Sequence, residues 1–327
     1  MEARPVIIWS DRYTEHTTGD HPESPRRIAA LRSAFEANGI FERSSVLEPS
    51  PASAEQVLRA HDEHVVQLVE RAAERGGGWL DPDTYVSSAS YEIALLAAGG
   101  AINAVDAVMA GAPVAFAFSR PPGHHAETRR AMGFCLFNNI AVAALHARAV
   151  HGLERIAIVD WDVHHGNGTE EIFWEDPGVL FDSTHQYPFY PGTGALDERG
   201  GGAGLGYTFN IPLPAGADDD MYLAVFEDLI APALRDYQPQ LMLVSAGYDA
   251  HRDDPLANMQ LTTAGFGRLA VIMRDLAGEL CPGKLVFVLE GGYNLIALGA
   301  SAVEVCNVFL DDAQQLRDPR SERNSGR

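Results

Sequence analysis

Short runs of apolar and β-branched residues recur along the chain. Several of these runs are apolar at nearly every position instead of alternating with polar residues, and this pattern is typical of strands buried on both faces, as in a parallel sheet. We therefore predict strands at residues 6–9, 114–118, 155–160, 178–183, 207–213, 241–247 and 285–292.

Segments whose apolar residues have helical spacing separate the predicted strands. Several begin after Asp, Asn, Ser or Thr or end on Gly, as helix termini do. They occupy residues 22–39, 53–78, 90–112, 138–152, 219–237 and 262–280. Such alternation predicts an α/β fold, a single-domain three-layer α/β/α sandwich with a mostly parallel central sheet.

Two segments depart from this alternation. Residues 182–205 are rich in Gly, Pro and Tyr and predict a long loop, and loops of this length inside a compact domain are usually functional. Residues 311–327 are polar and lack apolar periodicity, so we expect a mobile C-terminal tail there and a single domain over residues 1–310.

Composition and charge narrow the function classes. Hydrophobic residues make up 46% of the 327 residues and charged residues 21%, the balance of a globular protein. The formal net charge of -21 disfavours nucleic acid and anionic membranes as partners and favours cationic ligands. We find neither an apolar run of about 18 residues nor a signal-peptide core, so we expect a cytoplasmic location. A homo-oligomer is compatible with this composition and charge.

The cysteines do not suggest a disulfide framework or a thiolate zinc site. Cys135, Cys281 and Cys306 lie far apart in apolar surroundings, and the chain has no CxxC motif. We expect them to be reduced core residues.

Reactive side chains follow several of the predicted strands. In open α/β sheets ligands bind beyond the carboxyl ends of the strands, so polar residues there carry weight. The strand ends supply His124 and His125, then Asp160, Asp162, His164 and His165, then Asp249 and His251, and finally Tyr293.

The spacing after the 155–160 strand points to a metal. In extended backbone Asp160, Asp162 and His164 share one side of the chain, and Asp162 and His164 can meet one cation. Asp249 is the best-placed third ligand from another strand. Two aspartates and one histidine with an open position suit a catalytic divalent ion, zinc by default and iron or cobalt as alternatives.

The chain resembles the histone deacetylase and acetylpolyamine amidohydrolase family, and it is most similar to the class II branch. The matching motifs, in family order, are "HPESPRR", "RPPGHHAE", "GFCLFNN", "VDWDVHHGNGT", "YPGTG", "SAGYDAHRDDP" and "LEGGYN". This resemblance implies the arginase-like fold and a zinc-dependent deacetylase. It also implies that Asp162, His164 and Asp249 are the zinc ligands.

The same resemblance assigns roles to the tandem histidines. His124 and His125 would face the water on the metal, with Asp160 behind His124 and Asn167 behind His125. A carboxylate stabilises an imidazolium and a neutral amide does not, so the two imidazoles should titrate apart. We therefore expect neutral His125 to be the general base and then the acid, and His124 to be its positive electrostatic partner.

Other positions follow from the resemblance too. Tyr293 would donate a hydrogen bond to the substrate carbonyl and to the oxyanion that replaces it. Phe134 and Tyr190 would line a narrow tunnel for an acyl-lysine chain, with Gly133 beside it. Arg27 would lie in an inner channel that releases acetate, and a surface helix position is the alternative.

A structural potassium ion is also implied by the resemblance. Its ligands would be the Ser183 hydroxyl, Asp160, and main-chain carbonyls near Asp162, His164 and Thr184.

The substrate is less determined than the chemistry. The acidic chain suits an acetyl-lysine on a protein or peptide, or an acetylated polyamine. Polyamine specialists carry an acidic gatekeeper where this chain has Ala264 and Gly265, although Asp20, Asp81, Asp83, Asp253 or Asp254 could replace it. Asp83 is our choice for binding a substrate backbone amide at the rim, and Asp20 is a second candidate there. A two-manganese ureohydrolase and an inactive acyl-lysine-binding module are the remaining alternatives.

Overall fold

The computed structural model describes residues 4–315, with side chains through residue 310. Its main sheet has eight strands in the order β2-β1-β5-β10-β9-β6-β7-β8, and every neighbouring pair is parallel. These strands are β1 (Val6–Ile8), β2 (Ser45–Leu47), β5 (Ala115–Ala117), β6 (Ile156–Asp160), β7 (Val179–Gln186), β8 (Thr208–Leu213), β9 (Leu241–Ala246) and β10 (Leu285–Leu289). A separate antiparallel hairpin pairs β3 (Gly77–Trp79) with β4 (Tyr85–Ser87).

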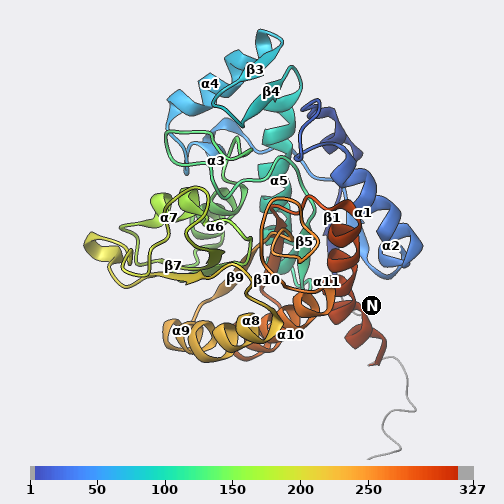
Figure 1. The fold of residues 1–327 in the computed structure, drawn as a ribbon, viewed down its shortest axis with the longest axis vertical. Coiled ribbons are helices and arrows are strands. Elements are labelled where there is room, and N and C mark those ends of the chain that lie inside the picture. Colours follow the sequence, from blue (N-terminus) through green and yellow to red (C-terminus); the bar gives the residue numbers. More distant parts are fainter. Residues whose placement is uncertain (1–3, 316–327) are drawn as a thin grey trace, which may run out of the picture.

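Helices cover both faces of the sheet (Figure 1). The α-helices are α1 (Arg26–Ala37), α2 (Ile40–Arg43), α3 (Ala54–Val57), α4 (Glu63–Glu74), α5 (Ser90–Met109), α6 (Asn139–His151), α7 (Asn167–Phe173), α8 (Asp219–Val225), α9 (Ala231–Tyr237), α10 (Thr263–Leu280) and α11 (Leu295–Gln315). Two short 3₁₀ helices, η1 (Asp11–Glu15) and η2 (Gly202–Gly204), and a π-helical turn, η3 (Phe226–Ile230), complete the chain.

Two hydrophobic cores lie between these layers. Alternate residues of β6 point into different cores, so Ile158 packs with residues of α4, α5 and α6. Its neighbour Val159 packs with residues of α1, α8, α10 and α11 on the other face. This arrangement is the predicted three-layer α/β/α sandwich, and it explains why the strand sequences are apolar at almost every position.

Four neighbouring central strands, in the order β5, β10, β9 and β6, are the ones that end in the predicted reactive residues. Because parallel strands have their carboxyl ends at one edge of the sheet, the loops after these strands meet there. The strand order therefore brings together segments that are more than 100 residues apart in sequence.

Several boundaries differ from the sequence-based expectations. The expected loop at residues 182–205 begins later, because β7 continues in register with β8 up to Gln186 opposite Leu213. The helical pattern at residues 53–78 forms two helices, since Asp62 caps a new helix with a bond from the His64 amide. The segment at residues 219–237 is interrupted by the π-helical turn η3.

The structure also contains elements that the hydrophobic pattern did not predict. These are β2, the β3–β4 hairpin, α2, α7 and α11. Helix α11 runs through Gln315, so the first five residues of the expected tail are helical. The remainder of that tail, residues 316–327, lies outside the described residues.

Helix α5 is long and apolar enough to cross a membrane by length and composition alone. However, 67% of its apolar window is buried inside the protein. Ile93, Ala97 and Ala101 of this helix are fully buried against neighbouring elements. This burial is typical of a core helix, and length and composition alone are weak evidence for a span.

Candidate active site

The loops after β6 and β9 bring Asp162, His164 and Asp249 together. Potential ligand atoms of these three residues all lie within 4.8 Å of one another. His164 Nδ1 is 3.1 Å from Asp162 Oδ1 and 3.2 Å from Asp249 Oδ2, and all three residues are buried. The structure thus brings together the three residues that the sequence analysis proposed as metal ligands.

The environment of these side chains fits a divalent cation. Asp249 Oδ2 is buried and accepts no hydrogen bond from the described residues, although His164 Nδ1 lies nearby. A Cβ atom at Gly247 would lie 2.1 Å from Asp162 Oδ2, and one at Gly291 would lie 2.0 Å from Asp249 Oδ2. Glycine is therefore required where the backbone approaches both carboxylates, and the oxygen and nitrogen donor set suits zinc, iron or cobalt.

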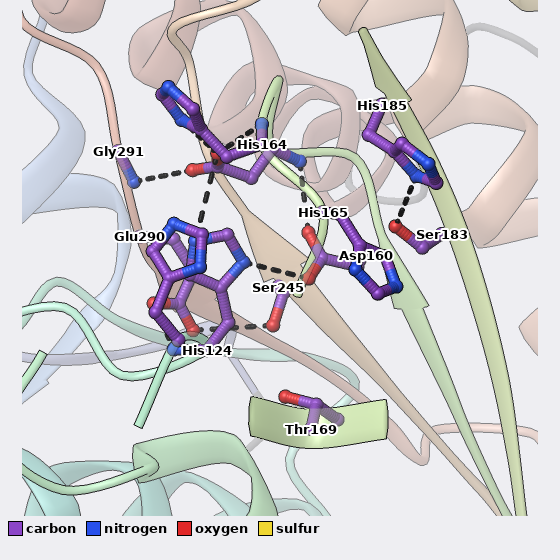
Figure 2. Close-up of polar contacts among 12 residues, drawn as sticks. His124, Asp160, His164, His165, Thr169, Ser183, His185, Ser245, Glu290 and Gly291 are labelled. Atoms are coloured by element: carbon purple, nitrogen blue, oxygen red, sulfur yellow. Dashed lines mark hydrogen bonds and ion pairs between the residues drawn. The ribbon is translucent and has the colours of Figure 1, made fainter. Parts of the chain in front are cut away.

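Backbone amides orient the two carboxylates. Asp162 Oδ1 accepts from the His164 amide at 2.9 Å, and Oδ2 accepts from the Gly291 amide at 2.8 Å (Figure 2). Asp249 Oδ1 accepts from the Val163 amide at 2.9 Å. Burial and the charge of Asp162 raise the pKa of Asp249 to about 7. Two buried carboxylates at this separation repel each other, and a shared cation would remove that repulsion.

The tandem histidines face the same region with different partners behind them. Their ring centres lie 4.0 Å apart. His124 Nδ1 is 2.9 Å from Asp160 Oδ2, and His125 Nδ1 is 2.8 Å from Asn167 Oδ1. Figure 2 shows the contact of His124 with Asp160. These are the two pairs that the sequence analysis proposed.

The pKa values of the two imidazoles shift in opposite directions. Burial alone would lower the pKa of His124, but the charges of Asp162 and Asp160 outweigh it and raise that pKa well above its usual range. Burial lowers the pKa of His125 well below its usual range, and the nearby His124 and His164 lower it further. Near neutral pH this arrangement favours a charged His124 and a neutral His125.

Glu290 is a buried part of the site that the residue-level sequence analysis missed. Its Oε2 accepts from the Gly123 amide at 2.6 Å and the His124 amide at 3.1 Å, and its Oε1 accepts from the Ser245 hydroxyl at 3.2 Å. Burial raises the pKa of Glu290 to about 7. The carboxyl group fixes the backbone of the tandem histidines. In the sequence, the one signal for Glu290 is its position between the end of a predicted strand and the two glycines that follow.

Aromatic side chains surround the histidines. The Tyr190 ring meets His125 edge-on with centres 5.2 Å apart, and the Phe134 ring meets Tyr293 edge-on at 5.7 Å. Gly133 has φ 57°, and a Cβ there would lie 2.5 Å from His125 Cδ2. Phe189, which the sequence analysis did not single out, stacks on His164 at 5.5 Å.

Both acidic rim candidates lie near these aromatic residues. Asp83 accepts from the Thr84 hydroxyl at 3.1 Å, and the same hydroxyl oxygen accepts from the Phe134 amide at 3.2 Å. Asp20 is exposed and lines a cavity of 380 Å³ together with Tyr293. The two aspartates therefore approach the site from different loops.

Arg27 is fully buried, so the alternative of a surface helix position is wrong. Its Nε donates to the Gly292 carbonyl at 2.8 Å, and its guanidinium lies 5.1 Å from the centre of the Tyr293 ring. The buried Arg27 guanidinium thus contacts both the Gly292 carbonyl and the Tyr293 ring.

The residues expected to hold potassium lie at the ends of β6 and β7. Asp160 is opposite Ser183 in the sheet register, and the Thr184 hydroxyl donates to the Asp160 carbonyl at 3.3 Å. The Ser183 hydroxyl is 3.0 Å from His185 Nδ1 (Figure 2). Potassium binding stays a prediction.

Two other strand-end histidines have separate partners. His165 is 2.8 Å from the Thr193 hydroxyl and 3.2 Å from Glu170 Oε2. His251 Nε2 is 3.2 Å from the Thr263 hydroxyl. Neither belongs to the Asp162, His164 and Asp249 group.

Known proteins resemble the chain over most of its length. Residues 21–309 match the family described as "Histone deacetylase domain". A "Probable deacetylase" of Archaeoglobus fulgidus is 44% identical, with 88% of this chain and 81% of the relative covered. A "Histone deacetylase-like amidohydrolase" of Pseudomonas aeruginosa is 42% identical, with 91% and 79% covered.

Plant proteins and a solved structure are similar as well. "Histone deacetylase 14, chloroplastic" of Arabidopsis thaliana is 43% identical, with 91% of this chain and 74% of the relative covered. The solved structure titled "Crystal Structure of HDA15 HD domain" superposes with a TM-score of 0.91 at 38% identity, covering 94% of this chain and 88% of the other.

Proposed function

The chain belongs to the histone deacetylase family, and from this membership we propose that it is a zinc-dependent amidohydrolase that removes acetyl groups from acetyl-lysine side chains. The observation that carries the proposal is a pair of buried imidazoles, one backed by a carboxylate and the other by an amide, beside the converging side chains of Asp162, His164 and Asp249. A deacetylase needs both a base and an electrophile at one carbonyl.

Asp162, His164 and Asp249 would hold the metal. When bound, zinc would polarise the substrate carbonyl and make a water molecule more acidic. The remaining chemistry belongs to side chains of this protein.

His125 has the geometry of the proton carrier. Asn167 Nδ2 donates to Glu127 Oε1 at 2.8 Å, which leaves Asn167 Oδ1 to accept from His125 Nδ1. His125 Nε2 then has a free lone pair, and it takes a proton from the water that attacks the acetyl carbon. As the C–N bond breaks, the same atom gives that proton to the departing lysine amine.

His124 and Tyr293 stabilise the negative charge that develops on the acetyl oxygen. His124 stays protonated beside Asp160 and contributes a positive charge. Burial raises the pKa of Tyr293 well above its usual range. Its hydroxyl therefore stays protonated and can donate a hydrogen bond to that oxygen. Phe134 and Tyr190 would hold the aliphatic lysine chain between them.

Release of acetate from an acetyl-lysine peptide tests the proposal. We expect metal-dependent release that a hydroxamate, which chelates zinc, inhibits. Removal of zinc with a chelator should abolish turnover, and added zinc should restore it. Turnover that persists without any divalent metal would contradict the proposal.

Acetylated polyamines are the second candidate substrates. The net charge of -21 and the acidic residues Asp20 and Asp83 near the aromatic rings favour a cationic substrate. A comparison of kcat/KM for an acetyl-lysine peptide, free acetyl-lysine, acetylputrescine and acetylspermidine separates the candidates, because this ratio measures discrimination. Urea production from a guanidino substrate would instead favour a ureohydrolase.

A further inference from the structure

A second group of metal-ligand side chains lies between α5 and α6. Asp106 is near the end of α5, while His146 and His151 lie in the last two turns of α6. The beginning of α6 contacts the catalytic segment, since the Asn139 amide nitrogen would lie only 2.4 Å from a Cβ at Gly123. The histidines occupy the opposite end of this helix, so the group is separate from the candidate active site.

The three side chains converge on one point. His146 Nε2 is 2.9 Å from Asp106 Oδ1, and His151 Nε2 is 2.7 Å from the same oxygen. The two imidazole ring centres are 5.6 Å apart. Candidate ligand atoms of all three residues lie within 4.8 Å of one another, as they do in the Asp162, His164 and Asp249 group.

This separation is close to that of ligands on a tetrahedral ion. Metal–ligand bonds of about 2.0–2.1 Å place neighbouring ligand atoms about 3.3 Å apart. The two N···O distances therefore need to open by only about half an ångström, which small side-chain rotations supply. Asp106 and His151 are partly exposed, with 44% and 23% of their side chains accessible, so water can complete the coordination.

His146 is the buried member of the group. The His146 side chain is only 6% exposed, and its Nδ1 atom has no hydrogen-bond partner among the described residues. An imidazole that leaves one nitrogen unpartnered in the interior costs free energy. A metal bond at Nε2 would not give Nδ1 a partner, so it is the convergence of the three side chains that indicates an ion.

The chemistry of the three side chains is also suitable. An ionised carboxylate with two imidazoles is a common ligand set for zinc, and the net charge of -21 attracts cations to the chain. We propose that Asp106, His146 and His151 form a second zinc site that joins α5 to α6.

The expected consequence is structural. Helices α5 and α6 pack against each other, and an ion that binds only the folded state stabilises it by an amount that grows with the logarithm of its affinity. Zinc should therefore raise the unfolding temperature even when the catalytic metal site is removed. For Nε2 to bind the ion, each imidazole must carry its hydrogen on Nδ1, a change of tautomer within the ring.

Metal counting in four full-length proteins tests the site. The proteins are stripped with a chelator, dialysed against micromolar zinc and analysed for zinc per chain. We expect about two ions in the unchanged chain and about one in Asp249→Asn, which removes a catalytic ligand. We expect about one in His151→Ala and in Asp106→Asn, both of which should retain deacetylase activity.

Two controls keep the outcome clear. His64→Ala removes an exposed histidine from α4 and should leave about two ions bound. In the Asp249→Asn background, Co²⁺ should give tetrahedral absorption bands that disappear in Asp249→Asn/His151→Ala. Equal zinc content in His151→Ala and the unchanged chain would overturn the second site. If Asp249→Asn were the only variant to lose zinc, the second site would be overturned but the proposed function would still stand.

Discussion

His124 and His125 show how one residue type can occupy two different chemical environments. They are neighbours in sequence, and their Nδ1 atoms contact a carboxylate and an amide oxygen respectively. The Glu290 carboxyl group accepts a hydrogen bond from the His124 backbone amide. Because an anion favours the imidazolium and a neutral amide does not, the pair can offer a cation and a base at the same pH.

Single substitutions of the two histidines should have unequal effects. We expect His125→Ala to lower kcat by about 10²–10⁴-fold, since proton transfer by a positioned side chain contributes about this much. His124→Ala should lower it less, because it removes a charge but leaves the base. Steady-state rates on an acetyl-lysine peptide measure both. Near-normal activity of His125→Ala with loss in His124→Ala would reverse the assignment.

Tyr293→Phe isolates one hydrogen bond. The aromatic contact with Phe134 remains in this variant, so packing should persist while the donor is lost. We expect kcat to fall by about 10²-fold or more, the usual cost of removing an oxyanion donor. A decrease of less than about threefold would show that the hydroxyl does not contact the reacting oxygen.

Asp182 on β7 is a buried carboxyl group whose desolvation lowers the stability of the fold. Both of its carboxyl oxygens are buried without a hydrogen-bond partner among the described residues, and burial raises the pKa of this carboxyl well above its usual range. It lines a cavity of 780 Å³ next to Leu180 and Phe209.

Replacing Asp182 by valine should therefore stabilise the protein in a pH-dependent way. A raised folded-state pKa means that stability is fully present below the unfolded pKa of about 4 and is lost as pH rises through the folded pKa. The gain from Asp182→Val should thus be larger at pH 8 than at pH 5, and about 1–3 kcal/mol at pH 8. Urea unfolding at both pH values measures it. A gain that does not change with pH would indicate that the carboxyl has the same protonation in the folded and unfolded states, so that folding does not raise its pKa.

The strand ends and the glycines that follow them together position the carboxylates of Asp162 and Asp249. The loops after β6, β9 and β10 each approach the Asp162, His164 and Asp249 group, and the Gly291 amide donates to Asp162 Oδ2. A Cβ at Gly291 would overlap Asp249 Oδ2. The geometry of the two carboxylates thus depends on the backbone of a third strand end.

Gly291→Ala should disrupt that geometry. We expect at least about a tenfold loss of metal affinity and of activity, because disturbing the groups that orient ligands typically costs about 10–100-fold. Gly278→Ala on α10 is the matched control, since a Cβ there meets no atom within 4 Å. The control should gain about 0.5–1 kcal/mol of stability, as alanine does over glycine in a helix. Equal zinc affinity in the two variants would contradict this prediction.

A buried ion network links the N-terminal segment to the loops of the candidate active site. Glu23 accepts from Arg120 Nε at 2.6 Å and Nη2 at 2.8 Å, and Arg27 Nη1 donates to it at 3.3 Å. Arg27 also donates to the Glu290 carbonyl. These contacts hold η1, α1 and the segments after β5 and β10 as one unit.

Acid should weaken this network. Burial would raise the pKa of Glu23, but Arg120 and His16 outweigh it and hold that pKa well below its usual range. A depressed folded-state pKa means that the contribution to stability is present above the unfolded pKa of about 4.3 and is lost as pH falls. We therefore expect the free energy of unfolding to fall steadily below about pH 5.

Glu23→Gln tests the network directly. It leaves two buried guanidinium groups without their carboxylate and should cost about 3–5 kcal/mol at pH 7. Glu36→Gln, which removes an exposed partner of Arg32, should cost about 1 kcal/mol or less. Thermal unfolding at pH 7 compares them. Similar unfolding temperatures for both variants would show that the network adds little.

The sequence by itself determined the alternation of helices and strands and the residues at the strand ends. Buried parallel strands must be apolar on both faces, and Asp162 and His164 lie close along one backbone segment. Local spacing is therefore sufficient to indicate a sheet and part of a candidate metal site.

Only the tertiary structure decided which distant groups meet. It placed Glu290 under His124, stacked Phe189 on His164, buried Arg27 and joined Asp106 to two histidines of α6. These contacts depend on strand order and helix packing, and a pattern of hydrophobic residues does not encode which elements become neighbours. The sheet order, which sets β5 beside β10 and β9 beside β6, is the physical reason why the predicted residues form one site.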